Sequence, residues 1–404
     1  MKTIKLFEFF SGIGSQLKAL KSLEEKLKFK TKSMGACDFY IDAIVSYMAI
    51  HYGILEPENN LDKQEMIEIL EKYVFSSNSK DIVARDYFKR IKEDKLRNLF
   101  SYLYAFLNNE YFNDRYIKFS TLQHHSKRER ERESGSDIRL FTKLPKKIDI
   151  LTYSFPCQDL SQQGKQKGLN KNTRSGLLYE IERILKENKN NLPKVLLLEN
   201  VKALATKKFI DQFNEWIEVL SDLGYNSNWK IINSSDFGSP QNRERVFMVS
   251  ILGDKKFEFP KINNLKLKIV NDIWQHNAQH ITFKLTKDQF LSNFNETKNQ
   301  IKKAFINNYT KFNSENYLYD LNAKGPTLTA SGANSRLKFL VNDEIKIMNS
   351  LESFLYMGFD VEDYEKVMKT NLVSDNKIIF TAGNSISVEV LSNIFEKLIK
   401  DKII

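Results

Sequence analysis

The chain has 404 residues, of which 41% are hydrophobic and 28% charged, a composition typical of a globular protein rather than a disordered one. At about 100–200 residues per domain, this length allows two or three domains. Lys and Arg number 62 against 51 Asp and Glu, and the net charge of +11 favours a polyanionic partner. Two cysteines are too few for a disulfide framework or a cysteine-rich metal site, and we expect no bound metal.

The sequence also argues against a membrane or secreted protein. No stretch approaches about 18 consecutive apolar residues, so we expect no transmembrane helix. The N-terminal apolar segment contains Glu8 and lacks a small-residue cleavage site, which argues against a signal peptide. We therefore expect a cytoplasmic protein.

The chain opens with the pattern of a strand, a tight turn and a helix. Residues 3–10 are apolar and β-prone, residues 11–14 break this run with two glycines, and leucines at helical spacing follow from position 17. A second β-prone segment leads to Asp38, and residues 41–50 have helical character.

Two further strands are predicted in the middle of the chain, at residues 148–155 and 195–201. The second has the continuous apolar run of a strand that is buried on both faces. Strands that alternate with helices predict an α/β fold with an open, mostly parallel sheet, where ligands bind at the carboxyl ends of the strands. The polar or reactive residues expected at those ends are Gly12, Asp38, Cys157 and Glu199.

Composition divides the chain into three parts. We predict a first domain at 1–254, a smaller Asn- and Lys-rich domain at 255–340, and a helical segment at 341–404 that packs back on the first domain. A Lys- and Glu-rich insertion at about 60–135 interrupts the first domain. Its alternating charges at 127–133 favour a solvated helix face or loop over a specific nucleic-acid contact, because the signs nearly cancel.

The first turn suggests a nucleoside-bearing cofactor. Gly12 and Gly14 allow a close approach of the backbone to a ligand, but Leu17 replaces the third glycine of a dinucleotide fingerprint. This departure favours a cofactor such as S-adenosylmethionine over one with a pyrophosphate, and an ordinary strand-to-helix turn is the alternative. Asp38 is suitably spaced to bind ribose hydroxyls, and Phe39 to stack on an adenine.

Cys157 is a candidate nucleophile. It follows a predicted buried strand and Pro156, on a loop where a thiol gains the partial exposure that reactivity requires. The alternative is a small buried hydrophobic residue, which is the commoner fate of a free cysteine. Cys37 fits that alternative, and we assign it no chemistry.

Three charged residues are candidates for substrate contacts. Glu199 ends an apolar strand, where a carboxylate is costly to bury unless it is functional or forms a structural ion pair. Arg243 and Arg245 lie two positions apart, so on an extended segment both side chains point to the same face. They would form either a salt-bridged surface edge or a clamp on a phosphate or a substrate.

In this order, the motifs resemble those of the DNA cytosine-C5 methyltransferases, over residues 4–60 and 136–400. The matching blocks are Phe10-Ser11-Gly12-Ile13-Gly14, Pro156-Cys157-Gln158, Glu199-Asn200-Val201, Gln241-Asn242-Arg243-Glu244-Arg245, Gly325-Pro326-Thr327-Leu328-Thr329 and Gly383-Asn384-Ser385-Ile386. The resemblance implies a Rossmann-like methyltransferase sheet with a second, smaller target-recognition domain between the fourth and fifth blocks. Residues 312–336 look similar to the CG-specific enzymes of wall-less bacteria.

The resemblance also implies a reaction on double-stranded DNA. The Cys157 thiolate would attack C6 of a cytosine that has flipped out of the duplex, and C5 would accept a methyl group from S-adenosylmethionine. Glu199 would contact N3 and the exocyclic amine. Arg245, with Arg243 nearby, would hold the base carbonyl and the backbone.

The family pattern assigns three further sets of residues. The expected cofactor contacts are Phe10, Gly12, Ile13, Asp38, Phe39, Asp137, Ile138, Pro156, Leu177, Asn384 and Ser385. The expected DNA and base-flipping loop contains Gln158, Ser161, Gln163 and Lys165. The expected target-recognition residues are Thr329, Ser331, Gly332, Asn334 and Arg336. Asp38-Phe39 replaces the more usual Glu-Trp pair but keeps a carboxylate and a ring.

Two alternatives accompany this interpretation. One is a tRNA cytosine-C5 methyltransferase with the same motifs, although the interval of about 80 residues between Arg245 and Gly325 favours a DNA-reading domain. The other is a catalytically silent DNA-binding module, against which the intact Cys157, Glu199 and Arg245 argue. We expect a monomer, either an orphan methylase or one with a cognate restriction endonuclease.

Overall fold

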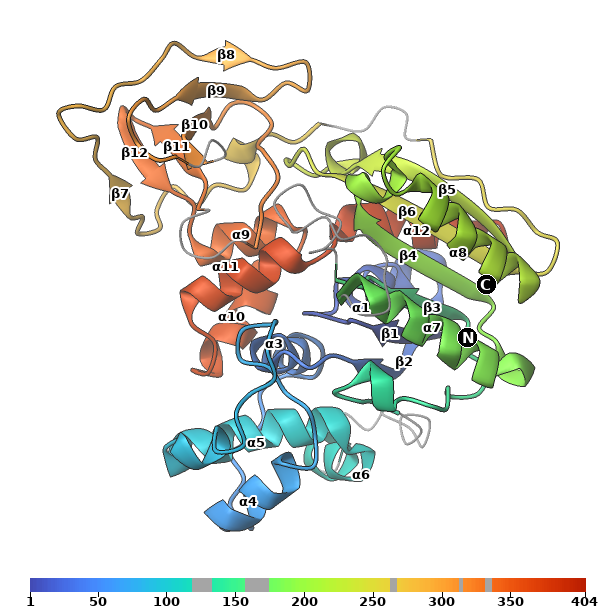
Figure 1. Ribbon diagram of the computed structural model, residues 1–404. Helices are drawn as coiled ribbons and strands as arrows, with labels where there is room; N and C mark the ends of the chain where they lie inside the picture. The colour runs from blue at the N-terminus through green and yellow to red at the C-terminus, as the bar shows by residue number, and fades with distance from the viewer. Residues whose placement is uncertain (118–132, 157–173, 262–266, 312–314, 331–335) are drawn as a thin grey trace.

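The computed structural model describes residues 1–117, 133–156, 174–261, 267–311, 315–330 and 336–404. These residues form two six-stranded sheets, of which the first is packed between helices (Figure 1). The strands of the first sheet lie in the order β2-β1-β3-β4-β6-β5. Their bounds are β1 Lys2–Phe9, β2 Phe29–Cys37, β3 Ile150–Tyr153, β4 Val195–Val201, β5 Tyr225–Asn233 and β6 Glu244–Leu252.

The first sheet is mostly parallel, as the sequence predicts. β1 pairs in parallel with β2 and β3, and β3 in parallel with β4, whereas β6 is antiparallel to both β4 and β5. The parallel strands therefore end at one edge of the sheet, where the turn at 10–12 and the polar residues Asp38 and Ser154 follow them and Glu199 lies near the end of β4.

Both faces of this sheet are covered, which explains the continuous apolar run in β4. Val195 and Leu197 belong to one hydrophobic cluster, and Leu196 and Leu198 to the other. Successive side chains of a strand point to opposite faces, so a strand between two layers of helices is apolar at every position. The helices that follow β1, β2, β3 and β4 are α1 Ser15–Lys21, α2 Glu24–Leu27, α3 Ile41–Tyr52, α7 Leu178–Glu187 and α8 Ile210–Asp222.

The insertion is mainly helical where the structure describes it. Its helices are α4 Lys63–Leu70, α5 Glu93–Leu107 and α6 Asn109–Phe112, with a 3₁₀ turn at Phe88–Arg90 and a π-helical turn at Asn113–Ile117. The apolar side of α5 joins the same cluster as α3, so the insertion extends the core of the first domain. Positions 127–132 of its alternating charge tract lie outside the described residues.

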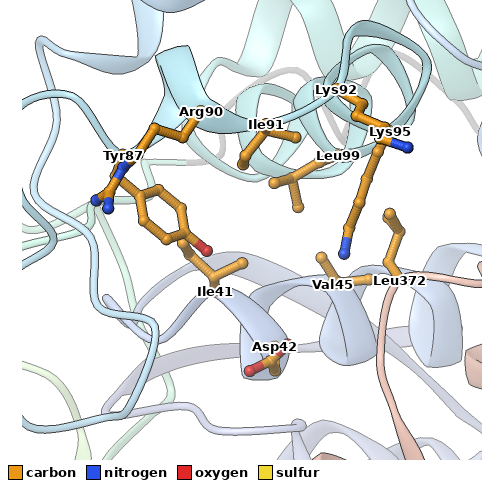
Figure 2. A pocket seen from close by; sticks show the side chains of 10 residues that line it. All are labelled: Ile41, Asp42, Val45, Tyr87, Arg90, Ile91, Lys92, Lys95, Leu99 and Leu372. Carbon is orange, nitrogen blue, oxygen red and sulfur yellow. The ribbon is translucent and has the colours of Figure 1, made fainter.

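A groove of about 450 Å³ separates the insertion from α3 (Figure 2). Its apolar floor includes Ile41 and Val45, and three cationic side chains, Arg90, Lys92 and Lys95, lie along the insertion side. None of the described candidate site residues lines this groove.

The second sheet spans residues 282–347, with the strand order β7-β12-β11-β10-β9-β8. Its strands are β7 Thr282–Phe283, β8 Asn295–Glu296, β9 Lys302–Phe305, β10 Tyr317–Asp320, β11 Lys338–Val341 and β12 Glu344–Ile347. β10 and β11 are parallel, and the other pairs are antiparallel. The sheet continues past position 340, where the composition had suggested a boundary, because β12 pairs with both β11 and β7.

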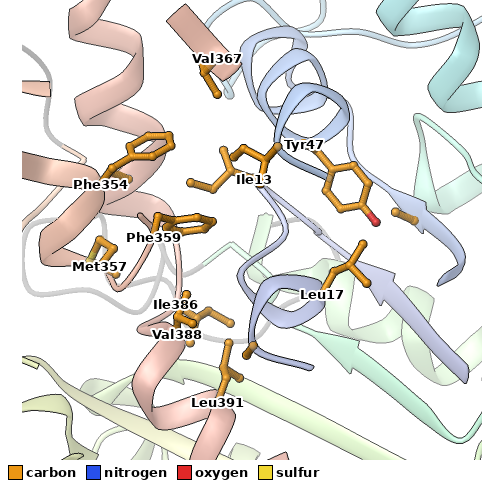
Figure 3. Packing of buried hydrophobic residues seen from close by; sticks show 14 of the residues in the cluster. Ile13, Leu17, Tyr47, Phe354, Met357, Phe359, Val367, Ile386, Val388 and Leu391 are labelled. Atoms are coloured by element: carbon orange, nitrogen blue, oxygen red, sulfur yellow. The ribbon is translucent and has the colours of Figure 1, made fainter. Parts of the chain in front are cut away.

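Four helices complete the chain: α9 Ser350–Tyr356, α10 Val361–Lys369, α11 Asp375–Asn384 and α12 Val388–Lys400. Phe354, Phe359 and Val388 pack against Ile13 and Leu17 of the first domain (Figure 3). Their apolar side chains are therefore buried against the turn and helix that follow β1.

One stretch of these helices, Asp375–Lys400, is long and apolar enough to cross a membrane. The structure divides it into α11 and α12, and 72% of its most apolar window is buried inside the protein. Such burial is typical of core helices, so the hydropathy of this stretch reflects packing.

Candidate active site

The turn after β1 has an unusual backbone conformation that needs its glycines. Phe10, Gly12 and Gly14 have φ angles of 55°, 54° and 79°, in the left-handed region. A Cβ atom at Gly14 would overlap Nε2 of His51, whereas nothing lies within 4 Å of the corresponding position at Gly12. The backbone at Gly12 is therefore open to a ligand.

The Asp38 carboxylate holds this turn against the end of β2. Its Oδ2 accepts a hydrogen bond from the Gly12 N–H at 2.8 Å, and its Oδ1 accepts one from the Tyr40 N–H at 2.9 Å. Burial raises the pKa of Asp38, and the backbone N–H donors of Tyr40, Gly12 and Phe39 oppose that shift. Asp38 and the half-buried Phe39 thus lie beside the glycine turn.

Asp137 lies close to Asp38 although 98 residues separate them in the chain. The Gly135 N–H donates to the Ala36 carbonyl at 3.0 Å, and the Asp38 N–H donates to the Gly135 carbonyl at 3.2 Å. Burial raises the pKa of Cys37 well above its ordinary value, and the charges of Asp38 and Asp137 raise it further. These contacts bring the two predicted cofactor acids together and keep Cys37 an inert thiol.

The remaining predicted cofactor residues surround the same strand ends. Phe10 and Leu177 pack against the cluster that contains Ile138 and Phe155, the residue before Pro156. A further bond joins the end of α11 to α1: the backbone N–H of Ile386 donates to Oγ of Ser15 at 3.3 Å. This bond draws the end of α11, with the exposed Asn384 and the buried Ser385, to the helix that follows the glycine turn.

Glu199 and Arg245 form an ion pair at the end of β4. Val201 lies opposite Arg245 in the antiparallel pair of β4 and β6, so Glu199, two residues earlier, shares a sheet face with Arg245. Nε of Arg245 lies 3.3 Å from Oε1 of Glu199, whose side chain is only 10% exposed. Burial raises the pKa of Glu199, against the opposing effects of Arg245, Arg243 and the Ser154 hydroxyl.

Asn200 connects this pair to the segment that leads to the predicted nucleophile. Its Nδ2 donates to the Phe155 carbonyl at 3.1 Å. Cys157 itself lies outside the described residues, as do Gln158, Ser161, Gln163 and Lys165 of the predicted base-flipping loop. Ser154, Phe155 and Pro156 are described, and they extend from β3 towards the same edge as Glu199.

Arg243 has partners that differ from the predicted base or backbone contacts of DNA. Its side chain is buried, and Nη1 donates to the Leu328 carbonyl at 2.8 Å. Nη2 donates to the carbonyls of Gly383 at 3.1 Å and Ser385 at 2.9 Å. These three acceptors belong to the protein itself, so the observed role of Arg243 is to join the backbone at Leu328 to the residues on either side of Asn384.

Only two of the predicted target-recognition residues are described. Thr329 packs closely on Gly383, where a Cβ atom would lie 2.7 Å from the Thr329 carbonyl oxygen. Arg336 donates a hydrogen bond to the side-chain oxygen of Asn376 on α11. Ser331, Gly332 and Asn334 lie outside the described residues. Within the described part of the chain, no three His, Cys, Asp or Glu side chains group together as metal ligands would.

A glycine-rich turn with a carboxylate at the end of the neighbouring parallel strand, beside a buried Glu–Arg pair, is typical of a nucleoside-cofactor enzyme with an α/β fold. The family model described as C-5 cytosine-specific DNA methylase matches residues 100–400. The orphan methyltransferase M.SssI from Spiroplasma monobiae is 44% identical over 98% of this chain and 97% of its own length. The type II methyltransferase M2.ScrFI from Lactococcus lactis subsp. cremoris is 31% identical, over 99% of this chain and 100% of its own length. The chain therefore belongs to the C-5 cytosine-specific DNA methylases, and it is a DNA cytosine-5-methyltransferase.

Solved structures agree on the fold. The Dnmt2 methyltransferase of S. pombe superposes with a TM-score of 0.56 at 15% sequence identity, and the two chains cover 99% of each other. The Entamoeba histolytica methyltransferase EhMeth superposes with a TM-score of 0.57 at 15% identity. The predicted Rossmann-like methyltransferase fold and the family resemblance are thus confirmed, including the similarity to an enzyme of a wall-less bacterium. Enzymes of this family generally depend on S-adenosylmethionine.

Proposed function

We propose that this enzyme methylates C5 of a flipped cytosine in a short, CG-containing site of double-stranded DNA, through a covalent bond between Cys157 and C6. The observation that carries the proposal is the buried pair of Glu199 and Arg245. It lies at the strand edge towards which Ser154, Phe155 and Pro156 lead. A nucleophile on that segment would face an acid that is suited to the cytosine ring.

The raised pKa of Glu199 supports its role towards the base. A carboxyl group that binds its proton more tightly than usual can share that proton with N3 as charge develops on the ring. Arg245 is partly exposed and keeps donors for the base carbonyl. Once Cys157 bonds to C6, C5 becomes nucleophilic and accepts the methyl group. Loss of the C5 proton and of the thiolate then restores the aromatic ring.

The described residues fit S-adenosylmethionine as the methyl donor. The open space beside Gly12 lets a ligand approach the backbone, and Asp38 offers carboxylate oxygens for ribose hydroxyls. Asp137 and Ile138 would contact the adenine, and Asn384 lies exposed at the opposite side. When bound, the cofactor supplies an electrophilic methyl group on a sulfonium.

The proposed preference for CG rests on the similarity of this chain to other enzymes. Residues 312–336 resemble the CG-specific enzymes of wall-less bacteria, and M.SssI from Spiroplasma shares 44% of its residues with this chain. We further propose a monomer that acts in the cytoplasm. Its relatives include both an orphan methyltransferase and type II methyltransferases, so either arrangement with an endonuclease fits the family.

The covalent step is tested with duplex DNA that contains 5-fluorocytosine, on which the wild-type enzyme should form a stable adduct in the presence of S-adenosylmethionine. Cys157→Ser should form no adduct and lose methylation, while it keeps its affinity for the cofactor. Near-wild-type turnover in this variant would overturn the assignment of Cys157 as the nucleophile.

The target and the substrate class need a separate test. Bisulfite sequencing of treated DNA maps the target sequence, and methylation of tRNA but not of duplex DNA would refute the proposed substrate.

A further inference from the structure

The adenine contact proposed above lies on a short turn outside the strands of the first sheet. Asp137 is the N-cap of the 3₁₀ helix η4, Ile138–Leu140, and its carboxylate accepts the Arg139 N–H at 3.0 Å. Two parts of the protein hold this turn. On one side, the Phe141 ring packs against those of Phe7 and Phe9 on β1, with centroids 5.3 and 5.2 Å away.

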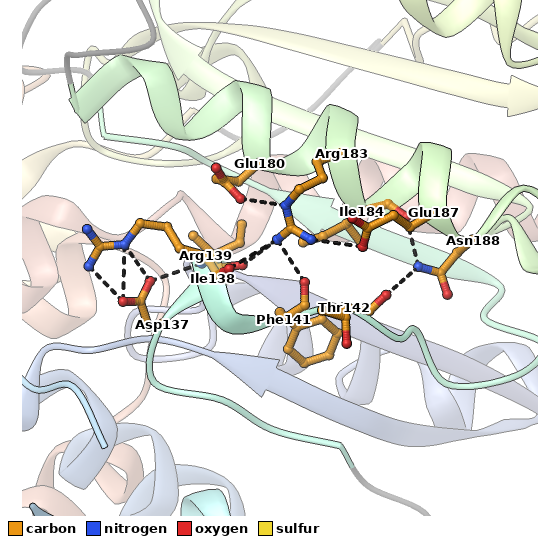
Figure 4. A network of polar contacts seen from close by, with 10 residues as sticks. All are labelled: Asp137, Ile138, Arg139, Phe141, Thr142, Glu180, Arg183, Ile184, Glu187 and Asn188. Carbon is orange, nitrogen blue, oxygen red and sulfur yellow. Dashed lines mark hydrogen bonds and ion pairs between the residues drawn. The ribbon is translucent and has the colours of Figure 1, made fainter. Parts of the chain in front are cut away.

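On the other side, one arginine of α7 binds the backbone of the turn (Figure 4). Nη2 of Arg183 donates to the carbonyls of Ile138 at 3.2 Å, Arg139 at 3.4 Å and Phe141 at 2.9 Å. These carbonyls belong to η4 and to Phe141, the residue that ends it, and a helix this short satisfies few of its own carbonyls. A guanidinium group is suited to this role because its donors are fixed in one plane.

Two carboxylates on the same helix orient Arg183. Nε donates to Glu180 at 2.8 Å and Nη1 to Glu187 at 2.9 Å, and the arginine side chain is 30% exposed. Holding Nε and Nη1 on α7 leaves Nη2 directed at the turn. The ion pairs therefore preorganise the guanidinium before any ligand binds.

We propose that Arg183 is a positioning residue for adenine recognition, acting through the backbone of residues 138–141. This inference rests on the proposed function, in which Asp137 and Ile138 contact the adenine. Arg139 binds both carboxylate oxygens of Asp137, and Arg183 holds the carbonyl of Arg139, so the Asp137 carboxylate is fixed relative to α7. If the turn were loose, the cofactor would have to order it on binding, which would lower the affinity for the cofactor.

The test compares Arg183→Ala with Lys186→Ala on the same helix. Lys186 forms an exposed ion pair with Glu182, and no bond from it to the turn is described. Arg183→Ala should weaken binding of S-adenosylmethionine, measured by calorimetry, by roughly tenfold and raise its KM equally. The kcat at saturating cofactor and the KM for DNA should stay near wild type. Lys186→Ala should match wild type, and Arg183→Lys, with fewer donors, should fall between.

Each outcome separates this inference from the proposed function. If the wild-type enzyme itself fails to bind S-adenosylmethionine, the proposed function fails. If the wild type binds it and Arg183→Ala binds it equally well, the positioning role is wrong. A loss of kcat with unchanged cofactor affinity would also overturn the role. Should Arg183→Ala not fold, the folded variants Arg183→Lys and Arg183→Gln decide the question. Wild-type affinity for S-adenosylmethionine in both variants would contradict the positioning role.

Discussion

At the scale of single residues, the Glu199 carboxyl group couples the active site to stability. Burial raises its pKa above the ordinary 4.5, despite the opposing effects of Arg245, Arg243 and Ser154. The folded protein therefore binds this proton more tightly than the unfolded chain does. The resulting stability is fully present below pH 4.5 and is lost as the pH rises through the folded pKa.

Replacing Glu199 with Gln should remove this pH dependence, because the amide stays neutral. We expect the Tm of Glu199→Gln, relative to wild type, to rise between pH 5 and pH 8, by about 1–2 °C for each kcal/mol of lost wild-type stability. Thermal unfolding at several pH values measures the difference. The control is Glu244→Gln, which removes an exposed carboxylate that pairs with Lys202. A Tm difference that is constant with pH would contradict the expected effect.

At the scale of elements, Arg243 joins segments that are far apart in the chain. Its guanidinium binds the carbonyls of Leu328, Gly383 and Ser385, so the start of β6, the loop before the target-recognition residues and the end of α11 meet at one side chain. Gln241 strengthens the same junction, since its side-chain oxygen accepts the Leu328 N–H at 2.9 Å.

Arg243→Ala should therefore behave as a structural variant. Leaving buried carbonyls without a donor should lower the free energy of unfolding by about 2–4 kcal/mol and weaken S-adenosylmethionine binding through Asn384. Urea unfolding and calorimetry measure both effects. Arg245→Ala is the comparison, and it should lose methyl transfer at saturating cofactor with a smaller loss of stability. If Arg243→Ala keeps full stability but loses turnover, a direct contact with the substrate is restored as its role.

At the scale of the whole molecule, the proposed target recognition and the proposed chemistry belong to different sheets. The second sheet has a small core of its own, with Ile306, Leu318 and Ile345 buried together. The segment Gly325 to Thr329 connects this sheet to the edge of the first sheet. The Gly325 N–H donates to the Pro240 carbonyl, and the Gly325 carbonyl accepts the Asn242 N–H.

This division predicts that substitutions in residues 308–336, such as Arg336→Ala, alter sequence preference more than maximal rate. Bisulfite mapping of the products reports preference, and methyl transfer at saturating DNA reports rate. The control is Lys89→Ala, which removes one exposed positive charge from the insertion. Unchanged preference across variants of residues 308–336 would refute the assignment of target recognition to this segment.

Local patterns were enough to predict three strands of the first sheet and their ends. The alternation and length of apolar runs predicted β1, β3 and β4 to within two residues at each end, because burial on a sheet is periodic along the chain. The helix expected from the leucines after position 17 is interrupted between α1 and α2, since helical spacing alone does not locate where a helix ends. Gly12, Asp38 and Glu199 were expected near one another because the carboxyl ends of parallel strands meet at one edge, and the structure places them at that edge.

The sequence by itself thus determined the fold class, the order of the motifs and the family. Only the tertiary structure decided the hydrogen-bond partners of Arg183 and Arg243. Arg183, beside glutamates at helical spacing, has the pattern of an ordinary surface ion pair, and its bonds to Ile138 and Phe141 cross more than 40 residues of chain. Arg243 was predicted beside the base, but its acceptors lie 85 to 142 residues away. A local pattern records which face of an element is buried, whereas the carbonyls that meet a buried guanidinium depend on how the whole chain packs.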